Sequence, residues 1–343
     1  MIMGEKKRLA FVTGATGMMG THLAKRLVKE GFAVRALVRP TSDTTELSKL
    51  GVERVIGDME DSAETFRKHL TGVTHVFHCA ALVDDWADRE VMYRINVTGL
   101  ENLLAGCVGL GLERIVAVSS MAIYGLGRQD NLDETHPLEY SGDNYNYTKI
   151  EAEKVCRRFV EEKGLPIVLI RPPYVYGEGD RQFLSRLCAT LRDGTFVYLG
   201  GGQIPMELVY AGNVVEALFL AGVKEGLKPG EDFIITDGKP VTRREIVETI
   251  CGVMGYERPK KSAPVWLAKA LCPLFELKAK LTGSKKVPRL NRFRLKFMAT
   301  HLTFNITKAK KLLGYRAVFD PGEALVRSVR WYAEQHPEMA GKK

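Results

Sequence analysis

A glycine-spaced turn between an apolar run and a helical pattern constrains the start of this chain more than any other feature. Residues 9–12 (LAFV) predict a short buried strand, and residues 13–20 (TGATGMMG) predict a turn. Residues 22–30 predict a helix, and residues 33–38 predict a second strand. This order forms a β-α-β unit, whose two strands run parallel.

Gly14, Gly17 and Gly20 lie three residues apart in this turn. Glycine is required where the backbone turns sharply, approaches a pyrophosphate without a Cβ, or packs a helix closely on a strand. The free N–H groups at the start of the helix then face the phosphates. A glycine triplet alone is equally typical of an ordinary turn, but a strand before it and a helix after it favour a dinucleotide site. The turn residues expected to bind the cofactor are Gly14, Thr16, Gly17, Met18, Met19 and Gly20.

The end of the second strand bears on the choice of dinucleotide. An NAD site usually carries an acid about 20 residues after the glycines to bind the ribose 2′-OH, whereas an NADP site offers a cation to the 2′-phosphate. Residues 37–40 read LVRP, with no acid at this position. We expect NADP(H) as the preferred cofactor, bound through Arg39. NAD(H) stays open if Arg39 is only a solvated side chain at a strand end.

Composition indicates a soluble enzyme with one large or two modest domains. The 343 residues are 45% hydrophobic and 27% charged, which is ordinary for a globular protein. The six cysteines form no CxxC pair, so we expect reduced thiols and no metal site. No signal peptide is evident, and no apolar stretch reaches the roughly 18 residues of a bilayer span. We expect a cytoplasmic protein, with membrane association left open by a basic stretch described below.

Strand and helix patterns alternate through the first half of the chain. Apolar strands are predicted at 52–56, 73–79, 114–119 and 167–171, and amphipathic helices at 63–69, 90–108 and 147–163. Such alternation predicts an α/β fold, a doubly wound parallel sheet (Rossmann fold) with helices on both faces. We assign residues 1–175 to a dinucleotide-binding Rossmann domain, with the chain returning near 206–236 through strands at 208–210 and 232–235. Residues 176–205 and 237–343 form a smaller, mostly C-terminal α+β substrate lobe.

Three polar residues predict a catalytic group. Ser120 follows the strand at 114–119, at the edge where open α/β sheets hold ligands. Tyr145 and Lys149 stand four apart at the opening of a helix, so their side chains share one face. An ammonium, with the positive ring of an oxidised nicotinamide, favours the phenolate of a tyrosine whose free pKa is about 10. We expect Tyr145 to handle the proton of a hydride transfer while Ser120 orients the substrate oxygen.

The spacing of Tyr145 and Lys149 has a simpler explanation, because such pairs are most often on a helix surface. Their position after a dinucleotide turn and a serine-tipped strand favours catalysis instead. Tyr147 faces elsewhere on the helix and has Glu151, not a lysine, four residues on.

Four motifs combine into a family resemblance: TGATGMMG, Ser120 in SSMAIYG, Tyr145 and Lys149 in YNYTK, and RPPYVYG at 171–177. Together they resemble the extended short-chain dehydrogenase/reductase superfamily over nearly the whole chain. The resemblance implies that Asp58 in GDMED contacts the adenine and that Lys149 also holds the nicotinamide ribose. It further implies a homodimer, and VRALVR is similar to the corresponding strand of NADPH-dependent dihydroflavonol reductases. The remaining implied cofactor contacts are Met59, Ala80, Ala81, Val118, Pro172 and Val175.

Branches of this superfamily differ at positions that bear on the substrate. Dehydratases place an Asp-Glu pair after the catalytic hydroxyl residue, whereas Met121 and Ala122 follow Ser120. Nucleotide-sugar epimerases carry an arginine that clamps the pyrophosphate, and Met206 stands in its place. The missing Asp-Glu pair argues against a dehydratase. A nucleotide-sugar epimerase or reductase stays as a second hypothesis, and a catalytically idle NADP-binding protein as a third.

An apolar substrate is our first expectation. The segment 210–213, FIITDGKPVT at 233–242 and FNITKAKKLLGY at 304–315 are similar to the 3β-hydroxysteroid dehydrogenase/isomerase branch. That branch implies a CH–OH dehydrogenase or reductase of a bulky lipid: a sterol, a 4α-carboxysterol with decarboxylation, or a long-chain β-keto acid. Where a carboxylate lies β to the new ketone, the ketone acts as electron sink and carbon dioxide leaves without a further catalytic group.

A basic amphipathic region at 262–311 begins with the helical pattern VWLAKALCPLFELKAKL at 265–281. Between Lys278 and Lys311 lie eleven Lys or Arg and no Asp or Glu, enough to account for the net charge of +9. Such a helix suits peripheral contact with an anionic membrane. The alternative is an amphipathic helix that closes the substrate lobe. No nucleic-acid-binding fold accompanies the charge, so we expect no nucleic-acid partner.

Overall fold

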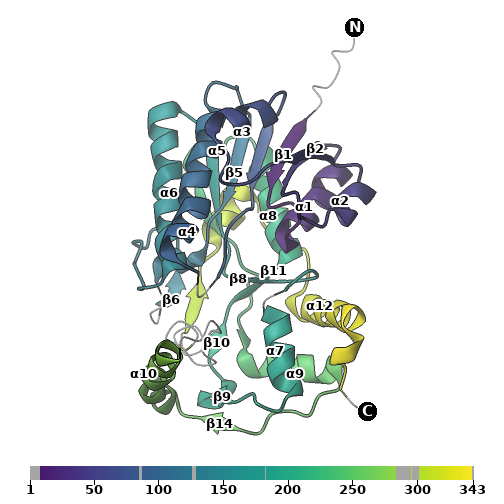
Figure 1. The fold of residues 1–343 in the computed structure, drawn as a ribbon, viewed down its shortest axis with the longest axis vertical. Coiled ribbons are helices and arrows are strands. Elements are labelled where there is room, and N and C mark those ends of the chain that lie inside the picture. Colours follow the sequence, from purple (N-terminus) through teal and green to yellow (C-terminus); the bar gives the residue numbers. More distant parts are fainter. Residues whose placement is uncertain are drawn as a thin grey trace.

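A parallel sheet forms the centre of the larger lobe (Figure 1). The computed structural model describes residues 8–84, 87–125, 129–181, 183–282, 295 and 301–341. The strands of the sheet are β1 (Leu9–Thr13), β2 (Ala33–Val38), β3 (Glu53–Ile56), β4 (His75–His78), β5 (Arg114–Val118), β7 (Ile167–Arg171) and β12 (Asp232–Ile234). Their order is β12-β7-β5-β4-β1-β2-β3, with parallel neighbours throughout. The order reverses between β1 and β4, the kind of switch point at which open α/β sheets hold ligands.

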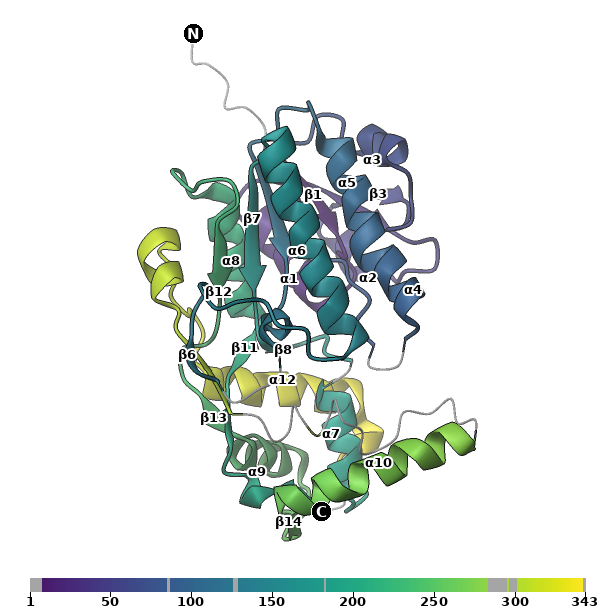
Figure 2. The ribbon, with the colours of Figure 1, turned by 90° about the vertical axis from the view of Figure 1, so that its left-hand side faces the viewer.

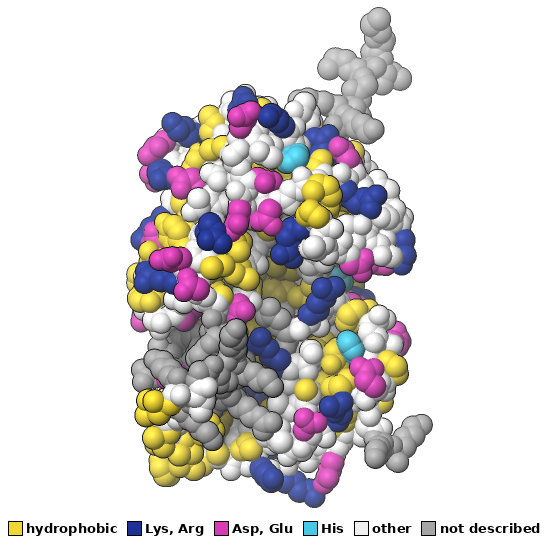
Figure 3. All heavy atoms as spheres, in the orientation of Figure 1, with side chains coloured by type: hydrophobic (Ala, Val, Ile, Leu, Met, Phe, Trp, Pro, Cys, Tyr) yellow, Lys and Arg dark blue, Asp and Glu magenta, His cyan; other side chains and the backbone are white. Residues whose placement is uncertain are grey.

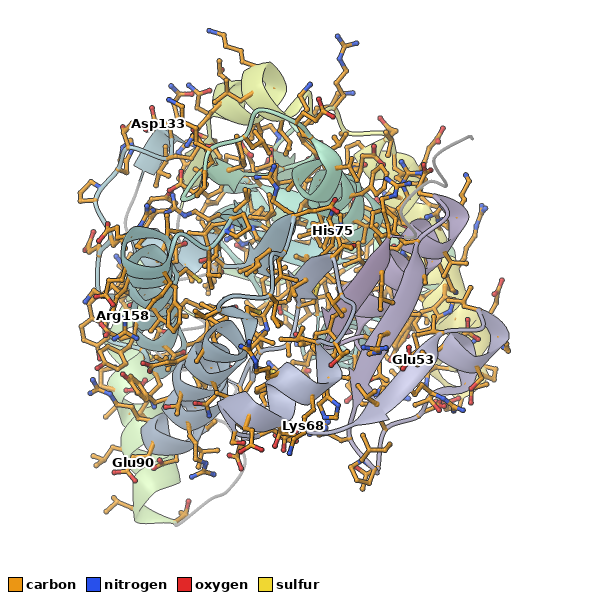
Figure 4. The ribbon with its side chains drawn as sticks, turned by 90° about the horizontal axis from the view of Figure 1, so that it is seen from above. Glu53, Lys68, His75, Glu90, Asp133 and Arg158 are labelled. Carbon is orange, nitrogen blue, oxygen red and sulfur yellow. The ribbon has the colours of Figure 1, made fainter. Side chains whose placement is uncertain are left out.

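Helices cover both faces of this sheet (Figure 2). One face carries α3 (Ala63–His69), α5 (Gly99–Cys107) and α6 (Asn144–Lys163), and the other carries α1 (Met18–Lys29) and α8 (Ala211–Val223). Successive side chains of β1 alternate between the two cores, so that Ala10 and Val12 pack toward α1 and α8 while Phe11 packs toward α3 and α5. Figure 4, seen from the amino ends of the strands, shows His75 near the middle of the sheet and Glu53 toward its rim.

Three helices build the core of the smaller lobe. They are α7 (Phe183–Arg192), α9 (Arg243–Met254) and α12 (Pro321–Gln335), which bury Leu184, Ile250 and Val329 between them. α9 begins with a capping box, in which the Thr242 and Glu245 side chains each bond the backbone of the other residue. A further helix, α10 (Val265–Leu281), runs along the outer side of this lobe (Figure 2).

Short strands connect the lobes. A four-stranded sheet has the order β13 (Val241–Thr242), β10 (Pro205–Met206), β15 (Leu302–Phe304) and β6 (Gln129–Leu132). Two parallel pairs are β8 (Tyr174–Tyr176) with β11 (Leu208–Tyr210) and β9 (Tyr198–Leu199) with β14 (Ser262–Ala263). The first pair follows the carboxyl end of β7, so it lies where the large sheet meets the smaller lobe (Figure 1).

The predicted doubly wound parallel sheet with a smaller C-terminal lobe is confirmed. The predicted start of the first helix at residue 22 is wrong, because Gly17 is the N-cap and α1 begins at Met18. The predicted helix at 90–108 is one continuous run in three parts: α4 (Arg89–Tyr93), a π-helical turn (Arg94–Thr98) and α5.

Two regional assignments differ from the structure. Residues 208–210 form a strand, but it pairs with β8 and not with the large sheet. Residues 304–315, assigned to the smaller lobe, contribute to the core beside the large sheet through Phe304, Ile306, Ala309, Leu313 and Tyr315. Of the predicted basic region at 262–311, residues 283–294 and 296–300 lie outside the described residues.

Candidate active site

The glycine turn is held against the end of β4. Gly14 has a φ of +69°, and a Cβ added there would lie 2.7 Å from the Ala80 backbone nitrogen. A Cβ on Gly20 would lie 2.1 Å from the Gly14 carbonyl oxygen, so both positions require glycine. Gly17 caps α1 without a side-chain bond, and no acid lies in the first turn. This leaves the first N–H groups of α1 available to an anion. Thr16, Met18 and Met19 lie half-buried around the turn.

Buried polar side chains tie β1 to β4 beside this turn. The Thr13 Oγ1 and His78 Nδ1 atoms are 2.9 Å apart, and the Ala80 backbone N–H donates to Thr13 Oγ1 at 3.3 Å. Burial lowers the pKa of His78 to about 3, so this histidine is neutral. The predicted cofactor contacts Ala80 and Ala81 lie in the segment after β4, and the Ala80 backbone packs against Gly14.

Arg39 and Asp58 lie at the same edge of the sheet, after β2 and β3. The Arg39 side chain is exposed and makes no hydrogen bond or ion pair with the residues that the structure describes. Asp58 accepts from the Glu60 backbone N–H at 3.1 Å, which fixes the turn after β3. Met59 is buried in that turn, and a Cβ on Gly99 would lie 2.2 Å from its carbonyl oxygen. A dinucleotide bound along this edge would lie near the Asp58 carboxylate and near the Arg39 guanidinium, which has no other partner among the described residues.

The three predicted catalytic residues come together at the carboxyl end of β5. Ser120 follows that strand, and its Oγ accepts from the Ala122 N–H at 3.1 Å. Asp143 caps α6 and accepts from the Asn146 N–H at 2.7 Å, so Tyr145 lies in the first turn of this helix. Tyr145 is hydrogen-bonded to Ser120, and Lys149 Nζ lies 5.9 Å from the centroid of the Tyr145 ring.

Burial controls the protonation of this group. It raises the pKa of Tyr145 to about 12, although the hydrogen bond with Ser120 opposes the rise. Burial also lowers the pKa of Lys149 to about 8, and its Nζ donates to the Val118 carbonyl at 2.9 Å. The expectation that Lys149 makes Tyr145 more acidic is not met within the protein itself. Tyr145 is a neutral hydrogen-bond donor at pH 7.

Sequence reasoning missed Asn96, which lies in the π-helical turn before α5. Its Oδ1 accepts from the Leu82 N–H at 2.7 Å, and its Nδ2 donates to the Leu82 carbonyl at 3.0 Å. The same Nδ2 lies 3.3 Å from Thr148 Oγ1. Asn96 thus fastens the loop after Ala81 to α6 beside Lys149. The only sequence signal was a single amide within a helical apolar pattern.

The segment after β7 completes the edge of the site. The Pro172 carbonyl accepts from the Met121 N–H at 3.0 Å, which joins it to the turn that starts at Ser120. Val175 pairs with Val209 in the short β8–β11 ladder. Both predicted nicotinamide neighbours, Pro172 and Val175, therefore lie at the same sheet edge as Ser120.

Tyr210 and Asn213, singled out by the sequence pattern, have a structural partner. The buried carboxylate of Asp237 accepts from the Tyr210 backbone N–H at 3.0 Å and from Asn213 Nδ2 at 2.7 Å. The Tyr176 hydroxyl donates to the same carboxylate at 3.2 Å. This cluster anchors β8 and β11 where the chain passes into the smaller lobe.

The position at which nucleotide-sugar epimerases carry an arginine is buried and apolar in this chain. Met206 is buried with Leu208 and Tyr198 in the core of the smaller lobe. Figure 3 shows the surface hollowed between the two lobes, with hydrophobic side chains in its floor.

Comparisons with known proteins agree with this geometry. The NAD dependent epimerase/dehydratase family matches residues 10–236. The chain is 32% identical over 310 residues to a 4-hydroxy-2-methyl-3-oxo-4-farnesyl-3,4-dihydroquinoline-1-oxide ketoreductase of Stigmatella aurantiaca, covering 89% of this chain and 91% of that protein. It is 29% identical over 350 residues to the 3beta-hydroxysteroid-dehydrogenase/decarboxylase isoform 2 of Arabidopsis thaliana, covering 95% of this chain and 62% of that protein.

Among solved structures, the crystal structure of gox2253 superposes with a TM-score of 0.78 at 29% sequence identity, covering 96% of this chain and 99% of that one. The resemblance stated from the motifs is confirmed at the level of the family. The chain belongs to the NAD dependent epimerase/dehydratase family, that is, the extended short-chain dehydrogenase/reductases, and is an NAD(P)-dependent oxidoreductase.

Proposed function

We propose that the protein transfers a hydride between NADP(H) and a hydroxyl or ketone of a bulky apolar lipid. The observation that carries this proposal is the cluster of Ser120, Tyr145 and Lys149 at the switch-point edge of the sheet. The uncapped start of α1 supports binding of the cofactor diphosphate, and the uncommitted Arg39 supports the choice of NADP.

In this mechanism the side chains of the protein position the substrate and move one proton. A bound nicotinamide supplies or accepts the hydride. Tyr145, neutral at pH 7, donates its phenolic proton to the carbonyl oxygen during reduction, and Ser120 hydrogen-bonds the same oxygen. In oxidation Tyr145 takes the proton back, which requires its phenolate. The ammonium of Lys149, held on the Val118 carbonyl, provides positive charge on the same face of α6.

Two observations support an apolar substrate. Met206 is buried among apolar residues and offers no cation to a diphosphate. The arginine that binds the diphosphate in nucleotide-sugar epimerases is therefore missing at that position. Two relatives are named for substrates with a farnesyl chain and a steroid skeleton, both large hydrocarbon groups. We infer a sterol, a 4-carboxysterol that loses carbon dioxide, or a long-chain β-oxo acid as the substrate class.

The test is Tyr145→Phe, with Tyr147→Phe as matched control on the same helix. Tyr147 stacks against Tyr93 and Tyr140, away from Ser120. Loss of the general acid should lower hydride transfer by roughly 10²- to 10⁴-fold while NADPH binding stays unchanged. The measurement is NADPH absorbance with a panel of sterols, 4-carboxysterols and β-oxo acids. Full turnover in Tyr145→Phe would overturn the catalytic assignment.

The same panel separates the alternatives. Tight binding and turnover of a nucleoside diphosphate sugar would replace the lipid proposal by a sugar-nucleotide epimerase or reductase. NADPH binding without turnover of any lipid alcohol or ketone would favour a catalytically idle NADP-binding protein.

A further inference from the structure

The α10 helix is attached to the protein by only a small part of its surface. Ala268 and Cys272 are buried, where they pack with Leu199 and Leu295 in a small separate cluster. These two α10 residues are four apart and so share one side of the helix. Val265 and Glu276 are partly buried, and the other α10 side chains that the structure describes are exposed.

The exposed side of α10 is apolar. Of the thirteen large hydrophobic residues that are exposed in the described part of the chain, seven lie on this helix. At 3.6 residues per turn, six of the seven fall on a continuous face opposite Ala268 and Cys272. This α10 face consists of Trp266, Leu267, Leu271, Leu274, Leu277 and Leu281. Trp266 and Leu274 have 69% and 61% of their surface exposed, whereas Leu267 and Leu271, with 36% and 39%, are less exposed.

This exposure argues against the idea that α10 closes the substrate lobe, because its large apolar side chains point away from the lobe. The face is also unsuited to water, since contiguous apolar patches on soluble proteins mark interaction sites. Figure 3 shows the patch as the densest group of hydrophobic side chains at the end of the smaller lobe.

The charge around α10 indicates what covers this face. Lys269 is exposed on the flank of the helix. In the sequence, the last turn of α10 and the chain that follows it, residues 278–296, contain eight Lys or Arg and no acid. A second copy of the chain would carry an equally basic stretch in its sequence directly after its own α10, and the two stretches would repel each other. An occupant that is apolar in its interior and anionic at its surface fits both properties.

We propose that α10 docks on the surface of an anionic lipid bilayer, with the α10 face inserted at the level of the headgroups. No helix among the described residues is long and apolar enough to cross a membrane, so the contact is peripheral. Trp266 suits the interface because tryptophan prefers the headgroup region, and the exposed Lys269 can reach the anionic phosphates. This proposal does not depend on the substrate proposed above.

Vesicle flotation of the full chain tests the proposal. The probes are vesicles of phosphatidylcholine alone and of phosphatidylcholine with phosphatidylglycerol. The variant is Leu274→Glu/Leu277→Glu, and the matched control is Ile56→Glu/Val318→Glu, whose residues are 61% and 58% exposed elsewhere on the surface. Far-UV circular dichroism and NADPH binding confirm that each variant is folded.

We expect the wild type and the control to float with the anionic vesicles and the α10 variant to lose binding by roughly tenfold or more. Added salt should weaken binding, because the headgroup attraction is screened. Equal flotation of the α10 variant and the wild type would overturn the proposal. Dimerisation through α10 would also overturn it. In that case the wild type would be a dimer and the α10 variant a monomer in sedimentation velocity, while both would float equally.

Discussion

Tyr145 and Lys149 show how burial sets the chemistry of single residues. Burial raises the pKa of Tyr145 to about 12 and lowers that of Lys149 to about 8. Reduction needs the protonated phenol, which persists over this range, so its rate should be flat from pH 6 to about pH 8. Above that pH Lys149 loses the positive charge that stabilises the developing phenolate, and the rate should fall. Oxidation needs the phenolate and should rise with pH over the same range. Initial rates in both directions from pH 6 to 10 check this, and parallel profiles would contradict it.

Arg39 is expected to decide the cofactor preference. Its side chain has no partner among the described residues, so a 2′-phosphate would be its first. Hydrogen bonds to charged groups contribute about 1.5–3 kcal/mol, so Arg39→Ala should weaken NADPH binding about 10- to 100-fold and leave NADH binding nearly unchanged. Fluorescence titration with both cofactors measures the effect.

The matched control is Arg54→Ala, because the Arg54 guanidinium is committed to Thr44 and Ser48 on the surface. An Arg39→Ala variant that keeps the wild-type preference would remove the argument for NADP.

Residue types at fixed spacing were enough to find Ser120, Tyr145 and Lys149, because chemistry restricts which side chains can do the task. The role of Asn96 was not predicted because its side chain bonds the backbone of Leu82, and a sequence does not show which side chains bond the backbone. The direction of the Tyr145 pKa shift escaped for a related reason. Burial depends on segments that are distant in the chain.

Among the elements, β7, α6 and β12 are joined by a buried ion cluster. Arg171 on β7 forms a bidentate ion pair with Glu153 on α6, in which Nε donates to Oε1 at 2.8 Å and Nη2 donates to Oε2 at 2.6 Å. It also lies 2.9 Å from Asp232 on β12. Burial alone would raise the pKa of Asp232, but Arg171 and Lys308 hold it below its ordinary value.

Removing the centre of this cluster should be costly. Arg171→Met takes away the buried cation that Glu153 bonds with both oxygens, while Asp232 keeps Arg157 and Lys308. We expect the free energy of unfolding to fall by about 3–5 kcal/mol. Arg157→Met is the control, because Arg157 bonds the same Asp232 from a half-exposed position and should cost at most about 1 kcal/mol. Urea unfolding of both variants compares them, and equal losses would refute a special role for Arg171.

Asp237 links β8, β11 and α8, and it should make stability depend on pH. Burial raises its pKa to about 7, above the ordinary value of 3.8. The folded state then keeps a proton that the unfolded state releases near pH 4, so the contribution of Asp237 to stability falls as pH rises from about 4 to 7. Asp237→Asn cannot titrate and should flatten this part of the curve. Thermal unfolding from pH 4 to 8 measures it, and an unchanged slope would assign the titration to another group.

Element boundaries were the less predictable part of the fold. Periodicity located the strand at 33–38 and the helix at 63–69 without error, because each is bounded by turn residues. It placed the start of α1 four residues late, because Met18 and Met19 extend the helix into the glycine turn itself. The strand at 208–210 was recognised, but its partner β8 depends on where the chain leaves the large sheet.

At the scale of the whole molecule, the site and the α10 face belong to one arrangement. The carboxyl ends of the large sheet face the smaller lobe, and α10 lies on the outer side of that lobe (Figures 1 and 2). An enzyme arranged in this way can take a lipid from a bilayer while its cofactor lobe stays in water. Periodicity located α10 in the sequence, but only the packing of Ala268 and Cys272 shows which face is left uncovered.

This arrangement predicts that α10 governs access to substrate and not the chemical step. With a β-oxo lipid held in anionic vesicles, Leu274→Glu/Leu277→Glu should raise the apparent KM by about tenfold and leave kcat unchanged, because only the partition onto the membrane is lost. With a short, water-soluble β-oxo acid the same variant should match the wild type in both constants. NADPH oxidation rates for the two substrates make the comparison. If KM rises equally for both, α10 acts on the substrate pocket itself, and the docking role assigned to its exposed face is wrong.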